Sequence, residues 1–185
     1  MQHFRTDALA ERLQVVWQLR VVRWLTAALF VAALAQTRVP LPFTPVPVTG
    51  QTLGVLLVGA WLAPGDAGMA LLLYAVLGAA GLPVFTGWGA GWSHIFGLTG
   101  GYILGFIAAA WTVSLLLRME AIHLPWRVWL ALVAGNAVIY LFGLPWLAAF
   151  VGMEKVLALG LLPFLPGDAL KLILAGMLLL AHQER

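Results

Sequence analysis

One acidic and one basic residue, Asp168 and Lys171, stand three positions apart in the last apolar stretch of the sequence. Residues at that spacing lie on one face of a helix, so the two can form an ion pair. A charge at bilayer depth costs about 2.5–3.5 kcal/mol on insertion scales, and such residues typically serve a ligand or a proton. Two apolar residues would be less costly if the pair only neutralised itself. We therefore expect Asp168 and Lys171 to belong to a binding site or to an acid–base pair.

Two further polar side chains, Asn136 and Tyr140, stand four positions apart and so share one face of a helix. Buried polar groups need hydrogen-bond partners, so both are expected to point inward, to a neighbouring helix or a cavity. Asn136 considered alone is better explained by a structural hydrogen bond.

Two connecting segments carry the remaining candidates. Segment 37–50 has prolines at positions 40, 42, 45 and 47, which fix φ and remove backbone donors, so it is predicted to be extended and stiff. It is either a rigid connector or a preorganised lid, with polar groups from Thr44, Thr49 and the adjacent Gln51. Segment 82–99 is rich in glycine and aromatic residues.

The tryptophans of segment 82–99, Trp88 and Trp92, fit an aromatic belt at the membrane surface and a binding wall about equally well. Ser93 and His94 are adjacent, but the sequence has no G-x-S-x-G elbow and no third triad member nearby, which argues against a hydrolase. The four histidines are scattered without zinc-site spacing, so no metal site is predicted.

Membrane helices must position these residues. Hydrophobic residues make up 63% of the 185 and charged residues only 9%, with a mean hydropathy of +0.99, whereas soluble domains are about 25% charged. We predict an all-α, polytopic membrane protein with one integral-membrane domain over residues 1–185. The basic residues lie mainly in an N-terminal arm, residues 1–21, and indicate topology rather than a nucleic-acid surface. Cysteine is absent, which excludes disulfides and thiolate sites.

Six apolar runs bounded by proline, glycine or charge are predicted to form a bundle over residues 22–182: Val22–Gln36, Gln51–Leu62, Ala67–Gly81, Gly100–Arg118, Trp126–Val151 and Gly167–His182. The second and third are shorter than the ~20 residues of a perpendicular span, so neighbouring helices must shelter their ends. Short helices interrupted by glycine or proline are typical of transporters.

The distribution of Lys and Arg predicts cytoplasmic N- and C-termini. One side would collect Arg5, Arg12, Arg20, Arg23, Arg118, Arg127 and Arg185, and the other only Arg38 and Lys155. Segments 37–50, 82–99 and 152–166 would then lie outside. Ala33-Leu34-Ala35 imitates a signal-peptide cleavage site, but the long charged arm makes a retained first helix the simpler interpretation.

Four collinear runs resemble motifs of the BioY biotin transporters: Val46-Pro-Val-Thr-Gly-Gln-Thr-Leu-Gly54, Gly81-Leu-Pro-Val-Phe85, Gly97-Leu-Thr-Gly-Gly-Tyr102 with Gly105-Phe106, and Pro163-Phe-Leu-Pro-Gly-Asp-Ala-Leu-Lys171. The resemblance covers about residues 25–180. Members of this family are substrate-binding S-components of energy-coupling factor (ECF) transporters. The resemblance implies six helices and a biotin site at the outer face.

By resemblance, Asp168 and Lys171 correspond to the family's acid–base pair at the biotin site, and Ala28 and Ala32 to the A-x-x-x-A strip that docks the coupling subunit. The ureido group, thioether ring and carboxylate of biotin suit an acid, a base, small polar groups and aromatic walls. The substrate-binding candidates are Thr44, Thr49, Gln51, Trp88, Thr99, Gly100, Gly101, Tyr102, Asn136, Tyr140, Asp168 and Lys171.

The sequence departs from the family pattern at two points. Leu98 replaces the proline usual in the Gly-Pro-Thr-Gly-Gly run, and the fourth predicted span lacks the expected basic partner for the biotin carboxylate.

The resemblance implies capture of biotin outside and its release to the cytoplasm, across a bacterial cytoplasmic membrane. It also implies partnership with two ATPase subunits and a membrane coupling subunit, because this sequence lacks a G-x-x-x-x-G-K-[ST] run that could bind ATP. No cofactor is expected besides biotin as the transported ligand. Two alternatives remain open: an S-component for thiamine or riboflavin, and a membrane enzyme using Asp168 with Lys171 or His94.

Overall fold

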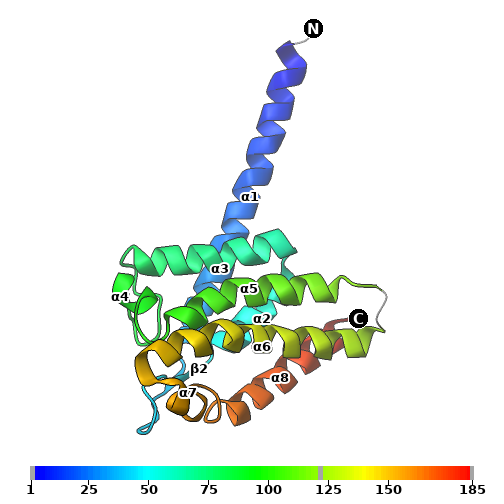
Figure 1. The fold of residues 1–185 in the computed structure, drawn as a ribbon. Coiled ribbons are helices and arrows are strands. Elements are labelled where there is room, and N and C mark those ends of the chain that lie inside the picture. Colours follow the sequence, from blue (N-terminus) through cyan, green and yellow to red (C-terminus); the bar gives the residue numbers. More distant parts are fainter. Residues whose placement is uncertain (1–2, 121–122, 184–185) are drawn as a thin grey trace.

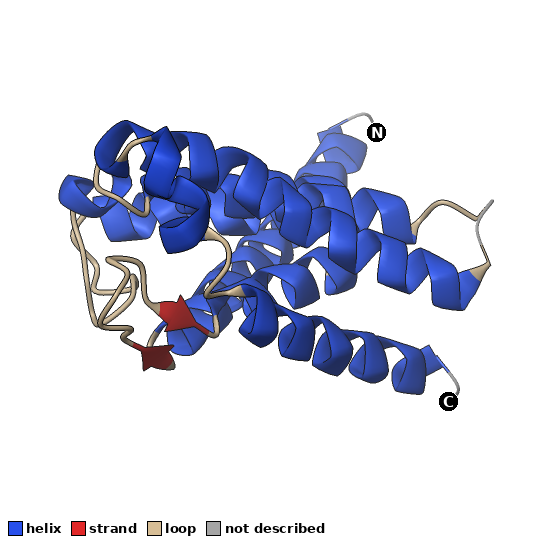
Figure 2. Cartoon of the chain, turned by 60° about the horizontal axis from the view of Figure 1, so that its bottom comes forward, coloured by secondary structure: helices blue, strands red, loops and turns tan. Residues whose placement is uncertain are grey.

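A computed structural model describes the backbone of residues 3–120 and 123–183, and the side chains of 15–120 and 123–181. This part of the chain forms eight helices and one short antiparallel ribbon, in which Arg38 pairs with Thr49 (Figures 1 and 2). In chain order the elements are α1 (His3–Ala35), β1 (Arg38–Val39), β2 (Val48–Thr49), α2 (Gln51–Trp61), α3 (Pro64–Ala79), α4 (Trp92–Ile95), α5 (Gly100–Leu117), α6 (Leu124–Val151), α7 (Met153–Gly160) and α8 (Leu165–Gln183).

The apolar helices are those of a multi-pass membrane protein. Within residues 3–120 and 123–183, three helices are long and apolar enough to cross a membrane: α1 over Val15–Ala35, α5 and α6. Helices α7 and α8 form a pair bent by 47°, and α2 and α3 are shorter apolar helices. The six predicted runs coincide with α1, α2, α3, α5, α6 and α8 to within a few residues, except at the start of α1.

Helix α1 runs without a break from the predicted arm into the first predicted span. Residues 3–35 contain no proline or glycine, so nothing in this sequence interrupts the backbone hydrogen bonds. Its N-terminal part projects away from the other helices (Figure 1). The side chains of Arg5, Arg12 and Arg185, which contribute to the predicted orientation, lie outside the described residues.

Two short helices were not predicted. Helix α7 lies within segment 152–166, after Gly152, whose φ of 85° ends α6, and α4 lies within segment 82–99. The last predicted span begins at Gly167, but the helix starts two residues earlier, so that Pro166 and Gly167 lie in the first turn of α8. Proline is tolerated there because the first backbone N–H groups of a helix have no intrahelical acceptor.

Helix α5 is central to the bundle and packs against α2, α3 and α6. Its contact with α6 depends on small residues, since a Cβ on Gly101 would lie 2.6 Å from the carbonyl oxygen of Phe142. A Cβ on Gly105 would lie 3.0 Å from the carbonyl oxygen of Ile139. Both glycines therefore allow the two helices to approach closely.

The predicted docking strip on the first helix is buried in this conformation of the chain. Ala28 is 1% exposed and Ala32 is 8% exposed, and both belong to the core cluster that includes Ala67 and Ala70 of α3. Small side chains here let α1 pack against its own neighbour, α3. The two alanines therefore do not form a surface on which another subunit could dock in this conformation.

Candidate ligand-binding cavity

A cavity lies where the β1–β2 ribbon, segment 82–99 and the start of α8 come together. About 660 Å³ of space in and at the mouth of the cavity is free of protein atoms, and this figure includes open solvent. Its wall is largely apolar and aromatic, with a few polar groups. The lining residues are Val46, Pro47, Thr49, Gln51, Thr52, Phe85, Thr86, His94, Thr99, Tyr102, Ile103, Phe106, Ile139, Tyr140, Phe164, Asp168 and Lys171.

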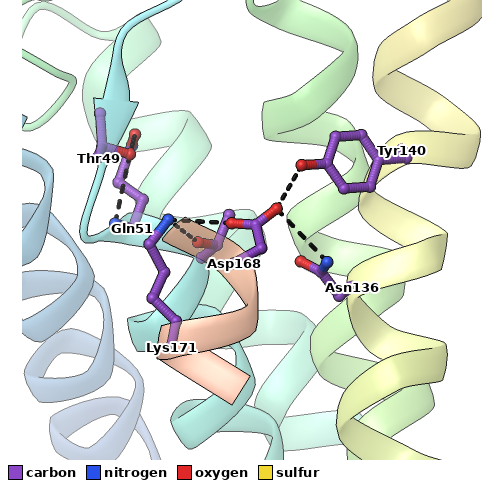
Figure 3. A network of polar contacts seen from close by, with 7 residues as sticks. Thr49, Gln51, Asn136, Tyr140, Asp168 and Lys171 are labelled. Carbon is purple, nitrogen blue, oxygen red and sulfur yellow. Dashed lines mark hydrogen bonds and ion pairs between the residues drawn. The ribbon is translucent and has the colours of Figure 1, made fainter. Parts of the chain in front are cut away.

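Asp168 and Lys171 form the predicted ion pair at this cavity. The Nζ of Lys171 lies 3.1 Å from Oδ1 of Asp168 and donates a second hydrogen bond to Oγ1 of Thr52, at 2.8 Å (Figure 3). The side chains are only 5% and 14% exposed for the acid and the base. Asp168 lies in the first turn of α8, where the helix dipole favours a carboxylate.

Helix α6 supplies two more donors to the same carboxylate. The hydroxyl of Tyr140 donates to Oδ2 of Asp168, and Nδ2 of Asn136 approaches that oxygen at 3.5 Å (Figure 3). The inward orientation predicted from their spacing is confirmed. Tyr140 also lines the cavity. Asn136 does not line it, although it contacts the carboxylate of Asp168.

Gln51, at the first position of α2, connects three parts of the wall. Its Oε1 accepts hydrogen bonds from the hydroxyls of Thr49, at 3.0 Å, and Thr86, at 2.9 Å. Its Nε2 donates to the buried hydroxyl of Tyr74, at 2.6 Å, and that hydroxyl donates to the carbonyl of Val84, at 3.2 Å. The amide group is therefore held in one orientation, with its polar atoms satisfied by protein groups.

The start of α5 brings Tyr102 and Thr99 to the cavity. The hydroxyl of Tyr102 donates to the carbonyl of Gly160 in α7, at 2.9 Å, and its ring lies edge-on to that of Tyr140. The turn before α5 forms with Leu98 in place of proline, since the N–H of Gly100 donates to the carbonyl of Gly97 at 3.1 Å.

Four predicted binding residues besides Asn136 do not line the cavity. Thr44 is buried and donates to the carbonyl of Leu159 at 2.6 Å, so it fastens segment 37–50 to α7. Trp88 is 70% exposed, because its positive φ of 62° lies in a tight turn that directs the ring outward. The other two, Gly100 and Gly101, lie where a Cβ would meet Ile95 or Trp146, so they serve packing.

Several lining residues were not predicted. Thr52 and Phe85 lie within the quoted motif runs, so those runs could have identified them, whereas Thr86 carried no distinguishing pattern. His94 was considered only as an acid–base group. Its Nδ1 lies 3.0 Å from the carbonyl oxygen of Ala90, and its ring stacks on Phe85.

A second buried acid, Asp66, lies at the α2–α3 turn, away from the cavity. Its Oδ1 accepts from the Nη2 of Arg20 at 2.8 Å and from the Nε1 of Trp24 at 2.9 Å, which joins α1 to α3. On the same turn, the carbonyl of Leu62 accepts from Arg118 at 3.0 Å.

Among the described residues, no group of three or more His, Asp or Glu side chains could hold a metal ion.

The sequence and the fold were compared with known proteins. A sequence model of a protein family, described as the "BioY family", matches residues 9–185. A probable biotin transporter BioY of Pyrococcus horikoshii is 40% identical over 145 residues, covering 78% of this chain and 85% of the relative. A biotin transporter BioY of Rhizobium etli is 33% identical over 166 residues, covering 85% of this chain and 89% of the relative.

The fold is also that of a solved S-component for biotin from an ECF-type ABC transporter. The TM-score is 0.75 at 21% sequence identity, and the match covers 90% of this chain and 91% of the other. The similar fold, the extent of the sequence match and the family model agree. The chain therefore belongs to the BioY family.

Proposed function

We propose that this chain binds biotin in the cavity at Asp168 and serves its transport across the membrane. The observation that carries the proposal is the buried, hydrogen-bonded Asp168 carboxylate in a largely apolar cavity, in a chain whose relatives are named as biotin transporters. Because those relatives are transporters, the alternative of a membrane enzyme is set aside. The ion pair then serves recognition, not proton chemistry.

Asp168 is suited to accept a hydrogen bond from a ureido N–H of biotin. A carboxylate has about four lone-pair sites, and Lys171, Tyr140 and Asn136 occupy three of them, so one acceptor site remains for the ligand. Lys171 balances the charge of the acid, and the rings of Phe106 and Phe164 offer apolar walls for the thioether ring.

The cavity is proposed to open to the outside of the cell. Arg20 and Arg118 both bind groups near the α2–α3 turn, at the other end of α2 from Gln51 and the cavity. The positive-inside rule then assigns that turn to the cytoplasm. Biotin would be captured from outside and released inside by a bundle of six spans with both termini cytoplasmic, in the cytoplasmic membrane.

Energy for transport is proposed to come from a membrane coupling subunit and two ATPase subunits. The structurally similar protein is an S-component of an ECF-type ABC transporter, and this sequence has no phosphate-binding P-loop. In the present conformation Ala28 and Ala32 are buried, so contact through them would require α1 to move relative to α3.

The test is titration of the purified full-length protein with biotin, thiamine and riboflavin, followed by the fluorescence of its nine tryptophans. We expect submicromolar binding of biotin and at least 100-fold weaker binding, about 2.7 kcal/mol, of the other two vitamins. Tighter binding of thiamine or riboflavin would reassign the ligand, and absence of biotin binding would refute the proposal.

A further inference from the structure

His94 lines the cavity from a different helix than the ion pair. It lies on α4, which packs against α3 and α5, whereas Asp168 lies on α8, which packs against α2 and α6 (Figure 1). Stacking on Phe85 and the contact with Ala90 fix the imidazole ring in place. The cavity thus has two polar ends, one at α8 and one at α4.

The contact with Ala90 determines the tautomer of His94. A carbonyl oxygen can only accept, so Nδ1 carries a hydrogen and donates it to Ala90. Nε2 is then an acceptor in the neutral ring and a charged donor once the ring is protonated. Within the described residues, no hydrogen bond engages Nε2 and no acidic side chain pairs with His94.

Lys171, the other basic side chain of the cavity wall, already has two hydrogen-bond acceptors. Lys171 donates to both Asp168 and Thr52, and an anionic ligand group beside it would also face the Asp168 carboxylate. Two negative charges at that distance repel strongly at low dielectric. A ligand that carries a carboxylate must therefore direct it away from α8.

We propose that His94, protonated at Nε2, binds the carboxylate of the ligand. The site would hold the ureido ring at Asp168 and the carboxylate at α4, and ligand binding would take up a proton. This inference rests on the proposed function, since it assigns one end of biotin to one residue. It also supplies, from segment 82–99, the basic partner that the fourth predicted span lacks.

Other titratable groups near His94 do not offer the same contact. On α3, Tyr74 donates to the carbonyl of Val84, and on α5, Tyr102 donates to that of Gly160. Across the cavity, Asp168 and Lys171 satisfy each other. Arg38 is the nearest alternative, since its guanidinium packs against Gly87 at the rim, but it is exposed and does not line the cavity.

The test compares biotin with biotinamide, its uncharged amide, on the full-length protein at several pH values between about 5.5 and 8. We expect wild-type protein to bind biotin about 10- to 100-fold more tightly than biotinamide, the effect of a charge-assisted hydrogen bond. Affinity for biotin should rise as the pH falls, because binding takes up a proton. Affinity for biotinamide should stay flat.

His94→Gln retains a neutral donor but cannot be charged, so it should abolish both the preference and its pH dependence. Folding of this variant is verified by thermal melting, because the ring of His94 also lines the cavity and stacks on Phe85. Arg38→Gln is the matched control and should keep the preference. Loss of the preference in Arg38→Gln would overturn the assignment.

Two further outcomes separate this inference from the proposed function. If wild-type protein binds biotin and biotinamide equally at every pH, His94 is not the carboxylate partner, although biotin remains the ligand. If it binds neither, the proposed function itself fails. Should His94→Gln not fold, the wild-type pH profile alone decides, and a flat profile refutes the role of His94.

Discussion

The ion pair of Asp168 and Lys171 could serve biotin, or each member could merely make the other tolerable in the membrane. Three variants separate these roles: Asp168→Asn, Lys171→Met and the double variant. The side chains are 5% and 14% exposed, so solvent screens them little. Removing one member of such a pair leaves an uncompensated charge, at a cost of about 3–5 kcal/mol.

For a chain of 185 residues, each kcal/mol shifts the melting temperature by about 2–4 °C, so each single variant should melt roughly 6–20 °C lower. The double variant leaves no buried charge unpaired and should recover most of that loss. Binding should behave differently. Asp168→Asn and the double variant both lack the Asp168 carboxylate and therefore lose a charge-assisted hydrogen bond to the ligand. The loss of about 1.5–3 kcal/mol corresponds to roughly 10- to 150-fold weaker binding.

Thermal melting in detergent and biotin titration, measured on the same four proteins, test this reasoning. The decisive combination is a double variant that is stable but binds poorly. If it bound biotin as tightly as wild type, the carboxylate would have no contact with the ligand. If the single variants were as stable as wild type, the pair would not be desolvated as the structure indicates.

Three further variants test the packing described above. Tyr74→Phe removes the acceptor of a buried glutamine amide, and should cost about 1–3 kcal/mol of stability and weaken biotin binding, measured by melting and titration. Gly101→Ala should prevent close approach of α5 and α6 and lower the yield of folded protein in size-exclusion chromatography. Gly65→Ala is the control, because a Cβ there would meet no other atom within 4 Å. Equal yields of the two variants would contradict the packing. Ala28→Leu should destabilise the isolated chain by about 1–3 kcal/mol, measured by melting, because the larger side chain does not fit against α3. Ala33→Leu, on the exposed face of α1, should be tolerated. If Ala28→Leu were tolerated as well, this position would not be buried.

The sequence predicted the helices well because proline, glycine and charge mark their ends in an otherwise apolar chain. The pairing of Asp168 with Lys171 and the inward orientation of Asn136 and Tyr140 were also predicted, since buried polar groups need partners, but not that Asn136 and Tyr140 contact Asp168. The short helix α7 was missed because its eight residues, which include Glu154 and Lys155, form too short an apolar run, and only Gly152 separates it from α6.

Predictions of which face a residue occupies were less successful. In a membrane protein the lipid-facing and core-facing sides of a helix are both apolar, so spacing alone could not show that Ala28 and Ala32 face α3. For Trp88, the turn geometry decides the direction of the ring, and tryptophan is not a residue that predicts positive φ. His94 stood alone in the sequence, without a partner to suggest its place in the cavity.

The prolines of segment 37–50 would also affect conformations in which this segment has moved away from α7. Any opening of this segment releases Thr44 from Leu159 and lets the backbone sample other conformations. Each proline restricts that sampling and favours closure by about 0.4–1 kcal/mol. Pro40, Pro42 and Pro45 do not line the cavity, yet together they would contribute roughly 1–3 kcal/mol to closure. Were ligand entry to require this opening, part of the affinity would be set by conformational entropy, at positions that do not line the cavity.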